Sequence, residues 1–429
     1  MPRKPSLPAD DPRAAGVSHQ VSLSRRWLAG LAVLVVVPWL IAAALFLPGR
    51  KAGERGSGPV HAGDEPPAPA VAGGAGPWGQ IVTRSIVISP PLEYIPEDVP
   101  APERIEWYFP GASRDEVARL LEAVGVPPGD AERIQATLRD EPRLRGVVAA
   151  APRELILGLD AEVRARLYLL LAAHPLNDRH RNAPRFRGDS VDEWLGQARI
   201  APETLALVRP LVYRNEGFLL FADIDLVQPR IGDHTELRRL YKALLRESTL
   251  LLELRIPPGA NADQLAAYWG IGGRRTDVRP LLESVAASGG SIDVVHLLPI
   301  FAREWLYRYP RVTLADLEKP ALANCFWTAL NFFEAKADDR FLQLDAALAT
   351  LKRDYYIVHD GFQIGDLVFL TAEDGSFYHA AAYVADGILF GKNGNSPLAP
   401  WMFVRLEHVK GYYPEHPGGR PVFYRRKGL

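Results

Sequence analysis

The sequence predicts an α+β protein with a single N-terminal transmembrane helix, a helix-rich middle domain and a C-terminal α+β domain. Three observations carry this prediction: an uncharged run over residues 27–47, helical patterns through residues 81–312, and a helix followed by alternating strands in residues 313–429. At 429 residues the chain has room for two or three domains. Its formal net charge of −1 gives no indication of nucleic-acid binding. High contents of Ala, Arg, Pro and Gly are typical of a GC-rich bacterial genome.

The first 47 residues carry the membrane prediction. Residues 1–26 are polar, contain five Lys or Arg residues, and are predicted to form a disordered cytoplasmic tail. Residues 27–47 form a run of 21 residues without a charged side chain, and about 20 apolar residues suffice for a helix to cross a bilayer. A cleaved secretory signal is the alternative, but its apolar region is typically about 7 to 15 residues long. The sequence therefore favours an uncleaved membrane anchor.

The charges around this run predict its orientation. Five basic residues precede it, while Arg50, Lys51 and Arg55 follow it, and an excess of Lys and Arg marks the cytoplasmic side. The predicted localisation is therefore the bacterial inner membrane, single-pass, with the later domains extracytoplasmic, in the periplasm. Residues 48–80 are rich in Gly, Pro and Ala and poor in large apolar side chains, so we expect a disordered linker there.

The middle region, residues 81–312, carries local signals of helices and a few strands. Ser113 and Ser190 each stand three residues before a Glu, which is the capping-box pattern of a helix N-terminus. The full set of predicted elements comprises strands over 81–89, 217–226 and 250–256, helices beginning at Ser113, Asp160, Ser190 and Asn261, a helix over 236–246, and a long helix over 293–309 ended by Pro310. These are ordinary structural elements without a motif of specific chemistry.

Other chemical groupings in the chain are weak signals. Asp223 and Asp225 share one face of their predicted strand, but without a third ligand nearby a solvated strand end is the favoured interpretation. His174 and His180 match no strong metal-binding spacing. The segment 387–392 has three residues between its glycines where a phosphate loop has four. The sequence therefore predicts no metal and no organic cofactor.

The only cysteine, Cys325, begins an apolar helical run near the C-terminus. A thiol reacts as the thiolate, and a helix N-terminus together with a nearby imidazolium lowers its pKa. If this domain is extracytoplasmic, a lone cysteine indicates either intermolecular pairing or a reactive thiol. Burial as a small apolar group is the alternative. The neighbouring residues favour the reactive thiol.

Those neighbours are an imidazole and an amide that follow the cysteine in the chain. Strands are predicted over 364–371 and 378–385, joined by a Glu-Asp-Gly turn, and His379 lies at the start of the second. Asn393 and Asn395 follow in a turn rich in asparagine. A thiol, an imidazole that takes its proton, and an amide that orients the imidazole form a cysteine-nucleophile site. Asn393 is the predicted orienting residue, with Asn395 as its substitute.

With these residues in view, about the last 110 residues resemble the NlpC/P60 cysteine hydrolases and the related CHAP amidases, which have a papain-like fold. The strongest part of the resemblance is Gly-Asp-Leu-Val-Phe at residues 365–369, one hairpin before a strand that His379 opens and that leads to Ala-Asp-Gly. The resemblance implies a papain-like C-terminal domain that hydrolyses amide bonds of bacterial cell-wall peptides. It also implies that Cys325 is the nucleophile and His379 the base.

The sequence departs from the family pattern at two places. The family usually has Asp-Cys-Ser at the nucleophile, whereas residues 324–326 read Asn-Cys-Phe. Many members place a second histidine where residues 391–393 read Gly-Lys-Asn, so the orienting group would be an asparagine. An inactive or repurposed copy of the fold is therefore one of the alternatives.

The functional prediction is a membrane-anchored extracytoplasmic cysteine hydrolase, an amidase or endopeptidase, that acts on peptide amide bonds of peptidoglycan through Cys325, His379 and Asn393. The reaction would pass through a thioester, with the backbone N–H of the cysteine as oxyanion donor. Predicted partners are a cell-wall peptide and the membrane, and no nucleic acid. The alternatives are a non-catalytic cell-envelope binding or scaffolding protein, and a cysteine acyl hydrolase or transferase on another substrate. Core packing is the default interpretation for most of the nearby aromatic residues, Tyr412 and Tyr413 among them, and the alternative for a few is the lining of a groove for a peptide or sugar.

Overall fold

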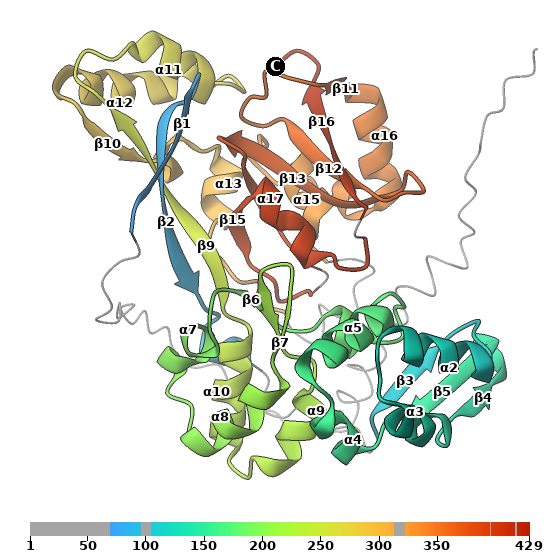
Figure 1. The fold of residues 1–429 in the computed structure, drawn as a ribbon. Coiled ribbons are helices and arrows are strands. Elements are labelled where there is room, and N and C mark those ends of the chain that lie inside the picture. The colour runs from blue at the N-terminus through green and yellow to red at the C-terminus, as the bar shows by residue number, and fades with distance from the viewer. Residues whose placement is uncertain (1–68, 96–103, 313–321, 395, 417) are drawn as a thin grey trace, which may run out of the picture.

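The computed structural model describes residues 69–95, 104–312, 322–394, 396–416 and 418–429, which form a mixed α+β structure. Within these residues the strands assemble into four sheets, and every strand pair is antiparallel. We refer to three parts: the ribbon unit (residues 69–88 and 247–309), the middle unit (104–246) and the C-terminal unit (322–429). Figure 1 shows the C-terminal unit beside the ribbon unit, with the middle unit beneath both.

The ribbon unit is built on a four-stranded sheet. Its strands, in spatial order, are β1 (Val71–Gly76), β2 (Gly79–Ile88), β9 (Glu247–Ile256) and β10 (Gly290–Asp293). The long pairing of β2 with β9 runs from Gln80 opposite Arg255 to Ile88 opposite Glu247. Its helices are α11 (Ala262–Trp269), α12 (Arg275–Ser288), η6 (Val294–Leu297) and α13 (Ile300–Trp305). The ribbon therefore joins segments that lie far apart in the sequence.

The middle unit contains two small sheets covered by short helices. One sheet has the order β3 (Glu106–Phe109), β5 (Gly146–Ala150), β4 (Arg139–Glu141), and the other has the order β6 (Arg185–Arg187), β8 (Phe218–Leu220), β7 (Tyr213–Asn215). The α-helices are α2 (Arg114–Ala123), α3 (Pro128–Gln135), α4 (Arg153–Gly158), α5 (Ala161–Ala172), α6 (Asp178–Arg181), α7 (Val191–Leu195), α8 (Pro202–Val208), α9 (Ile224–Val227) and α10 (His234–Leu244).

The C-terminal unit is organised by a six-stranded sheet. Its strands, in spatial order, are β11 (Tyr355–Val358), β16 (Arg420–Arg426), β12 (Leu367–Thr371), β13 (Phe377–Ala385), β14 (Ile388–Lys392) and β15 (Trp401–Arg405). The helices of the unit are α15 (Cys325–Leu330), η7 (Asp339–Leu342), α16 (Leu344–Asp354), α17 (Leu406–Val409) and η8 (Lys410–Tyr412). The predicted strands around the Glu-Asp-Gly turn are confirmed as β12 and β13, which pair in a hairpin.

This sheet lies between two hydrophobic cores. On one face Phe369 and Ala380 pack in a core that includes Trp327 of α15 and residues of the ribbon unit. On the other face Leu370 and Ala381 pack in a core shared with the middle unit. Because successive residues of a strand point to opposite faces, the alternation along β12 and β13 decides which core each side chain enters.

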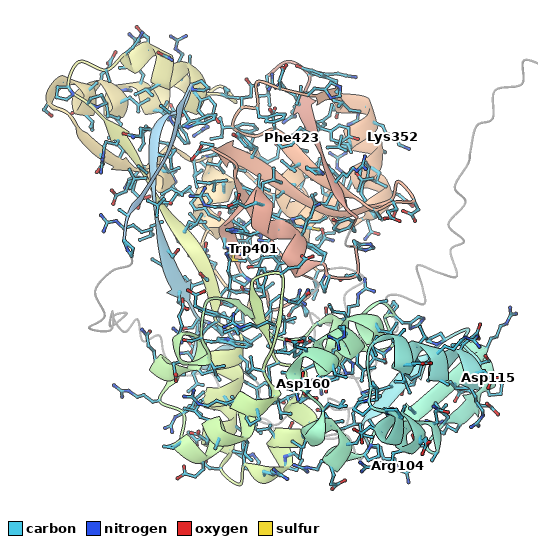
Figure 2. All side chains as sticks on the ribbon, viewed as in Figure 1. Arg104, Asp115, Asp160, Lys352, Trp401 and Phe423 are labelled. Atoms are coloured by element: carbon cyan, nitrogen blue, oxygen red, sulfur yellow. The ribbon has the colours of Figure 1, made fainter. Side chains whose placement is uncertain are left out.

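The ribbon unit and the C-terminal unit also meet through backbone contacts at β15. Tyr307 N–H donates to the carbonyl of Trp401 at 2.8 Å, and Trp401 N–H donates to the carbonyl of Arg308 at 3.0 Å. The Thr249 hydroxyl on β9 donates to the carbonyl of Phe403 at 2.8 Å. Figure 2 labels Trp401 at this border, where side chains fill the space between the ribbons. The start of β9 is thus held against the C-terminal sheet.

The predicted fold class needs a correction at the N-terminus. Among the described residues, no helix is both long and apolar enough to cross a membrane. The predicted tail and transmembrane helix at residues 1–26 and 27–47 lie outside the described residues. The fold class that the structure supports is therefore a mixed α+β protein without a membrane-spanning helix in its described part. Part of the predicted linker is also wrong, because residues 71–76 form β1 and residues 79–80 begin β2.

The middle region is less helical than predicted because residues 81–312 contribute to three sheets. The predicted strand over 217–226 ends at Leu220, and a short helix begins at Ile224. The predicted long helix over 293–309 is divided into η6 and α13. Pro299 explains that division, since the residue before a proline disfavours helical backbone and Leu298 is extended, with ψ 153°.

The predicted helix starts at Ser113 and Ser190 are confirmed, but the reciprocal bonds of a capping box form only at Ser113, since the Glu193 carboxylate accepts from Asp189 N–H. The Ser113 hydroxyl accepts from Glu116 N–H, and the Glu116 carboxylate accepts from Ser113 N–H at 2.7 Å. The Ser190 hydroxyl likewise accepts from Glu193 N–H at 3.1 Å. Asp160 caps α5 as predicted. These starts depend on residues three or fewer positions apart, which is why the sequence alone predicts them.

Candidate active site around Cys325

Cys325 is the first residue of the six-residue helix α15. Asn324 caps this helix, because its side-chain oxygen accepts from Trp327 N–H at 3.0 Å. The Thr328 hydroxyl donates to the Asn324 carbonyl at 2.7 Å and accepts from the indole N–H of Trp401 at 2.8 Å. The asparagine that precedes the cysteine therefore has a structural role: it fixes where the helix starts and so where the sulfur lies.

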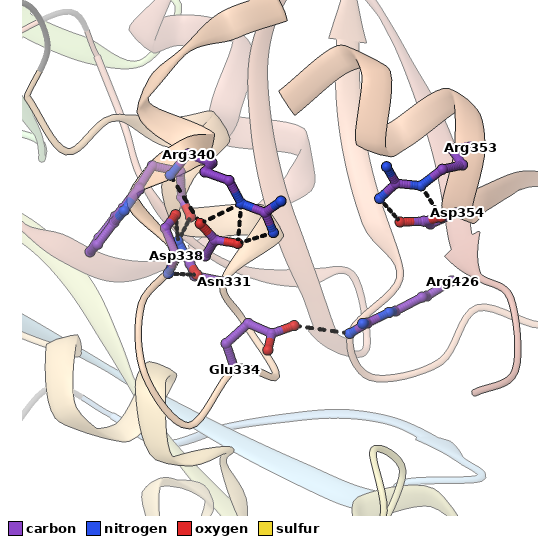
Figure 3. Close-up of polar contacts among 8 residues, drawn as sticks. Asn331, Glu334, Asp338, Arg340, Arg353, Asp354 and Arg426 are labelled. Carbon is purple, nitrogen blue, oxygen red and sulfur yellow. Dashed lines mark hydrogen bonds and ion pairs between the residues drawn. The ribbon is translucent and has the colours of Figure 1, made fainter. Parts of the chain in front are cut away.

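The loop after α15 is held by polar contacts that Figure 3 shows. The Asn331 amide oxygen accepts from Asp338 N–H at 2.7 Å, and the Asp338 carboxylate accepts from the Arg340 guanidinium at 2.9 Å. The Arg426 guanidinium of β16 donates to the Glu334 carboxylate at 3.0 Å. These contacts tie the C-terminal end of the cysteine helix to the sheet.

The Gly-Asp pair that opens the Gly-Asp-Leu-Val-Phe segment also has a structural explanation. Gly365 has φ +84°, and a Cβ there would come within 1.9 Å of the Phe333 ring, so both conformation and space require glycine. The buried Asp366 carboxylate accepts two hydrogen bonds of 2.8 Å from the Arg425 guanidinium. A bidentate pair of this kind fixes both side chains. The segment thereby positions the loop after α15 against β16.

The thiol of Cys325 lies at the start of β13. The residue is half-buried, and burial raises the pKa of its thiol. The backbone N–H groups of Ala380, Phe326 and Cys325 itself act in the opposite direction, as does the ammonium of Lys392. Burial outweighs them, so at neutral pH the sulfur is mainly a thiol rather than the thiolate expected from the sequence.

His379 is the next residue before Ala380, and its ring is fully buried. Burial lowers the pKa of His379 to about 3, so the imidazole is neutral at physiological pH. Its Nδ1 lies 2.6 Å from the hydroxyl of Tyr413, whereas Nε2 has no hydrogen-bond partner among the described residues. A neutral imidazole is the form that can accept a proton from a thiol.

Tyr413 determines the tautomer of this imidazole. Its hydroxyl oxygen accepts from Gly394 N–H at 3.0 Å, and burial raises the pKa of Tyr413 well above its ordinary value, so the phenol keeps its proton. That proton is then donated to Nδ1 of His379, which leaves the imidazole proton on Nε2. We assign this arrangement from the hydrogen-bond network.

Asn393 follows β14 and shares a sheet face with His379. The pairing of β13 with β14 places Ala382 opposite Phe390. Continued by three residues, the same register places His379 opposite Asn393. A Cβ added at Gly391 would lie 3.2 Å from the Cβ of Ala381 and 3.8 Å from the Asn393 amide oxygen, which agrees with this register. Both amide atoms of the buried Asn393 lack a hydrogen-bond partner in the described part of the chain.

The structure therefore brings the three predicted residues to one end of the C-terminal sheet, but without completing a triad. His379 and Asn393 share one sheet face with Tyr413, while the sulfur of Cys325 approaches the backbone of the neighbouring Ala380. Neither ring nitrogen of His379 hydrogen-bonds to the thiol. The substitute residue Asn395 lies outside the described residues.

Lys392 is a site residue that sequence reasoning missed. Its side chain is only 3% exposed, and its ammonium donates to the carbonyls of Ser396 at 3.0 Å and Pro397 at 3.3 Å. The ammonium also lies 5.6 Å from the ring centre of Trp401. Burial lowers the pKa of Lys392 to about 7, although the nearby Cys325 acts to raise it. The signal in the sequence was a lysine at the end of an otherwise apolar strand.

Glu247 of the ribbon unit is a second missed residue. Its carboxylate accepts from the Tyr412 hydroxyl at 3.2 Å, and burial raises the pKa of Glu247 to about 8. The positive charges of Arg185 and Lys392 oppose that shift. Glu247 precedes the site residues by many positions in the chain, so no local pattern could connect it with them.

The other candidates from the sequence lie in the middle unit. Asp223 accepts from the Tyr168 hydroxyl at 2.6 Å, and Asp225 forms an ion pair with Arg179 at 3.2 Å. The two carboxylates do not share a strand face, because α9 begins at Ile224 between them. Nowhere in the described residues do three or more His, Cys, Asp or Glu side chains gather in a group that could hold a metal ion.

Comparisons with known proteins were made at three levels: no protein-family model, no curated protein and no solved structure matches this chain. The resemblance to the NlpC/P60 hydrolases therefore depends on the residues quoted from the sequence alone. A fold does not fix an activity, so the chemistry of the site is what indicates a function.

Proposed function

We propose that the C-terminal unit is a cysteine hydrolase for amide bonds, with peptide amides of peptidoglycan as its substrate. Cys325 is the nucleophile, His379 the base and Asn393 the residue that orients the imidazole in the reacting complex. The observation that carries the proposal is the position of the sulfur at a helix N-terminus, beside the backbone of Ala380, the residue that follows the neutral imidazole of His379 in β13. This arrangement supplies a nucleophile, a base and backbone N–H donors within one small region.

A neutral thiol and a neutral imidazole require the proton to leave as the sulfur attacks. The hydroxyl of Tyr413 hydrogen-bonds to Nδ1 of His379. In this proposal it carries the proton from Cys325 to His379. The thiol of Cys325 gives its proton to the phenol oxygen, the phenol gives its own proton to Nδ1, and the S–C bond forms at the substrate carbonyl. The imidazolium then protonates the leaving amine, and water hydrolyses the resulting thioester with the imidazole again as base.

Groups already in place stabilise the negative charge that develops during the attack. The backbone N–H groups that lower the thiol pKa also stabilise negative charge at the sulfur, and the ammonium of Lys392 adds an opposite charge in a buried setting. The N–H of Cys325 is the proposed donor to the carbonyl oxygen. Preorganised donors of this type are among the largest contributions to acyl-transfer catalysis.

The test measures release of peptide products from purified muropeptides by the full chain. Cys325→Ala removes the nucleophile and is expected to abolish product release, while Cys325→Ser retains the size of the side chain as a control for packing. Hydrolysis at the wild-type rate in Cys325→Ala would overturn the proposal. Reaction of the wild-type thiol with a peptide-based acylating probe, followed by mass spectrometry, detects the thioester step separately.

A second candidate function is a non-catalytic binding module for cell-wall peptide. It is favoured by two observations: the raised pKa of the Cys325 thiol and the hydroxyl of Tyr413 that occupies Nδ1 of His379. On this hypothesis muropeptides bind without being cleaved, and Cys325→Ser leaves their affinity unchanged. Equilibrium binding and product release measured on the same preparation distinguish the two functions.

A further inference from the structure

A cavity of about 60 Å³ lies between the middle unit, the start of β9 and the loop after β14. A cavity of about 10 to 15 Å³ is enough to hold one water molecule, so this one has space for more than one water or for a small organic group. The residues around it include Asn182 and Arg185 of the middle unit, Glu247 of the ribbon unit, and Asn393, Ser396 and Tyr412 of the C-terminal unit. The cavity therefore joins segments from all three units.

Asn393 is the first indication that this cavity takes a ligand. The side chain lines the cavity and is only 1% exposed, yet neither its amide oxygen nor its amide nitrogen has a partner in the described residues. Buried side-chain amides normally form hydrogen bonds. An amide with an unused donor and acceptor at a cavity wall is complementary to a polar ligand group.

The charges on the cavity wall indicate which kind of ligand group binds there. The buried guanidinium of Arg185 donates to the carbonyls of Gly411 at 3.1 Å, Tyr412 at 2.8 Å and Arg181 at 3.0 Å. No carboxylate of the described residues forms an ion pair with it. No anionic side chain hydrogen-bonds to this buried cation in the described residues, and an anion nearby would stabilise it.

Glu247 is the acidic side chain at the wall. Because burial raises its pKa to about 8, it is mostly a neutral acid at pH 7 and offers a donor rather than a negative charge. The charged and titratable groups that influence it are Arg185, Lys392, Tyr412 and Tyr309. The wall at neutral pH thus combines a cation, a protonated acid and a free amide.

We infer that this cavity binds a carboxylate group, held by the amide N–H of Asn393 and the carboxyl group of Glu247 and balanced by the charge of Arg185. The ligand is a small carboxylic acid or the terminal carboxylate of a peptide. Since Asn393 also lies opposite His379 in the sheet register, a peptide anchored here would lie beside the proposed catalytic residues. The idea that this peptide is the substrate rests on the proposed function. The binding of a carboxylate in the cavity does not depend on it.

The experiment measures the thermal unfolding temperature of the full chain with sodium acetate, acetamide or sodium chloride at matched ionic strength. Acetate and acetamide have similar size and shape and differ in charge. A ligand that binds only the folded state stabilises it, so saturating acetate should raise the unfolding temperature by roughly 1 to 3 °C, while acetamide should not. N-acetylglycine tests the peptide terminus: a larger shift than that of acetate supports a peptide ligand, and an equal shift supports a small acid. Equal shifts with acetate and chloride would overturn the inference.

Two substitutions test whether the acetate-dependent rise in unfolding temperature comes from this cavity. Asn393→Asp places a fixed carboxylate in the cavity and should remove the acetate shift, whereas Asn215→Asp makes the same chemical change on β7 and should retain it. Glu247→Gln keeps a neutral side chain at all pH values, so its acetate shift should persist at pH 9, where the wild-type shift declines. Saturation-transfer NMR on the acetate methyl group gives a second measurement that does not depend on unfolding. An undiminished acetate signal in Asn393→Asp would overturn the site.

Cys325→Ala distinguishes this inference from the proposed hydrolase. The variant should retain the full acetate shift, because the cysteine does not line the cavity. In the wild-type chain, acetate binding without any hydrolysis would support the cavity and contradict the enzyme, and hydrolysis without acetate binding would support the enzyme and overturn the cavity. A loss of acetate binding in Cys325→Ala would count against the position assigned to the ligand.

Discussion

Two buried tyrosine–histidine clusters make an informative comparison. In the middle unit the Tyr168 hydroxyl donates to Asp223 at 2.6 Å and its ring lies edge-on to His180, with the ring centres 4.6 Å apart. In the C-terminal unit the Tyr413 hydroxyl lies 2.6 Å from His379. Burial lowers the pKa of both histidines to about 3. By titration alone the two clusters would be equally good candidates for an active site.

The groups around each cluster distinguish the two tyrosine–histidine clusters. The C-terminal cluster lies next to a thiol at a helix N-terminus, a buried lysine and a cavity with an unpartnered amide. In the middle-unit cluster the Tyr168 hydroxyl is bonded to Asp223, and the fully buried Arg164 donates to the backbone carbonyls of Leu159 and Pro210. The first set contains the groups of the proposed acyl transfer, and the second ties together segments of the middle unit. A perturbed pKa becomes a sign of function only when a nucleophile and an accessible space accompany it.

The largest expected difference between the clusters comes from their histidines. His379→Ala removes the proposed base, so hydrolysis of muropeptides should fall by roughly 10²- to 10⁴-fold. His180→Ala should leave the rate per folded molecule unchanged and lower the free energy of unfolding by about 1 to 3 kcal/mol, because it opens space in a packed core. Steady-state kinetics and denaturant unfolding of both variants test this. Equal rate losses would remove the distinction between the two clusters.

Substitution of the two tyrosines should likewise change the rate in the C-terminal cluster and the stability in the middle-unit cluster, with a smaller change in rate. Tyr413→Phe removes the hydroxyl that passes the proton to His379, and we expect about a tenfold loss of kcat/KM and an altered pH profile of Cys325 alkylation. Tyr168→Phe leaves the Asp223 carboxyl without its hydrogen bond, which should lower stability by about 1 to 3 kcal/mol with an unchanged rate. An unaltered alkylation profile in Tyr413→Phe would show that the proton does not pass through this hydroxyl.

Lys392 should have a milder effect on the thiol. Its ammonium favours the thiolate of Cys325, so Lys392→Met should raise the thiol pKa further and slow alkylation at pH 7 by roughly threefold. Lys352→Met on the exposed side of α16 is the matched control and should change nothing. The rate of iodoacetamide reaction against pH is the measurement. A rate in Lys392→Met equal to that of the control would mean that the ammonium exerts no influence on the sulfur.

The sequence could predict the parts of the site that depend on nearby residues. The start of α15 at Cys325 and the β12–β13 hairpin that carries His379 were predicted because a polar residue before an apolar run and a Glu-Asp-Gly turn act locally. The capping box at Ser113 and the serine cap at Ser190 follow the same rule. Local chemistry therefore identified the cysteine, the histidine and their order along the chain.

The other features of the site depend on contacts between segments that are distant in the sequence. The β2–β9 ribbon brings Glu247 to the C-terminal unit, and no pattern in either strand indicates that pairing. Tyr413 was assigned to core packing because an aromatic residue after a strand gives no sign of its hydroxyl partner. The raised thiol pKa of Cys325 depends on burial by several segments, which outweighs the local helix N-terminus. Long-range packing thus decided the electrostatics that the sequence could not predict.

The last prediction concerns stability and leaves activity unaffected. Burial raises the pKa of Asp223 from 3.8 to about 7, so the folded state holds a proton that the unfolded state loses at lower pH. The stabilisation is fully present below about pH 3.8 and is lost as pH rises through about 7, with a slope of at most about 1.4 kcal/mol per pH unit. In Asp223→Asn this part of the pH dependence should disappear, while product release per folded molecule stays at the wild-type value. Urea unfolding at intervals from pH 4 to pH 8 provides the comparison, and the difference between wild type and variant isolates Asp223 from Glu247, which titrates in an overlapping range. Parallel stability curves would mean that Asp223 is ionised in the folded protein, and the middle-unit cluster would then be a buried ion pair with Arg164 rather than a neutral hydrogen-bonded network.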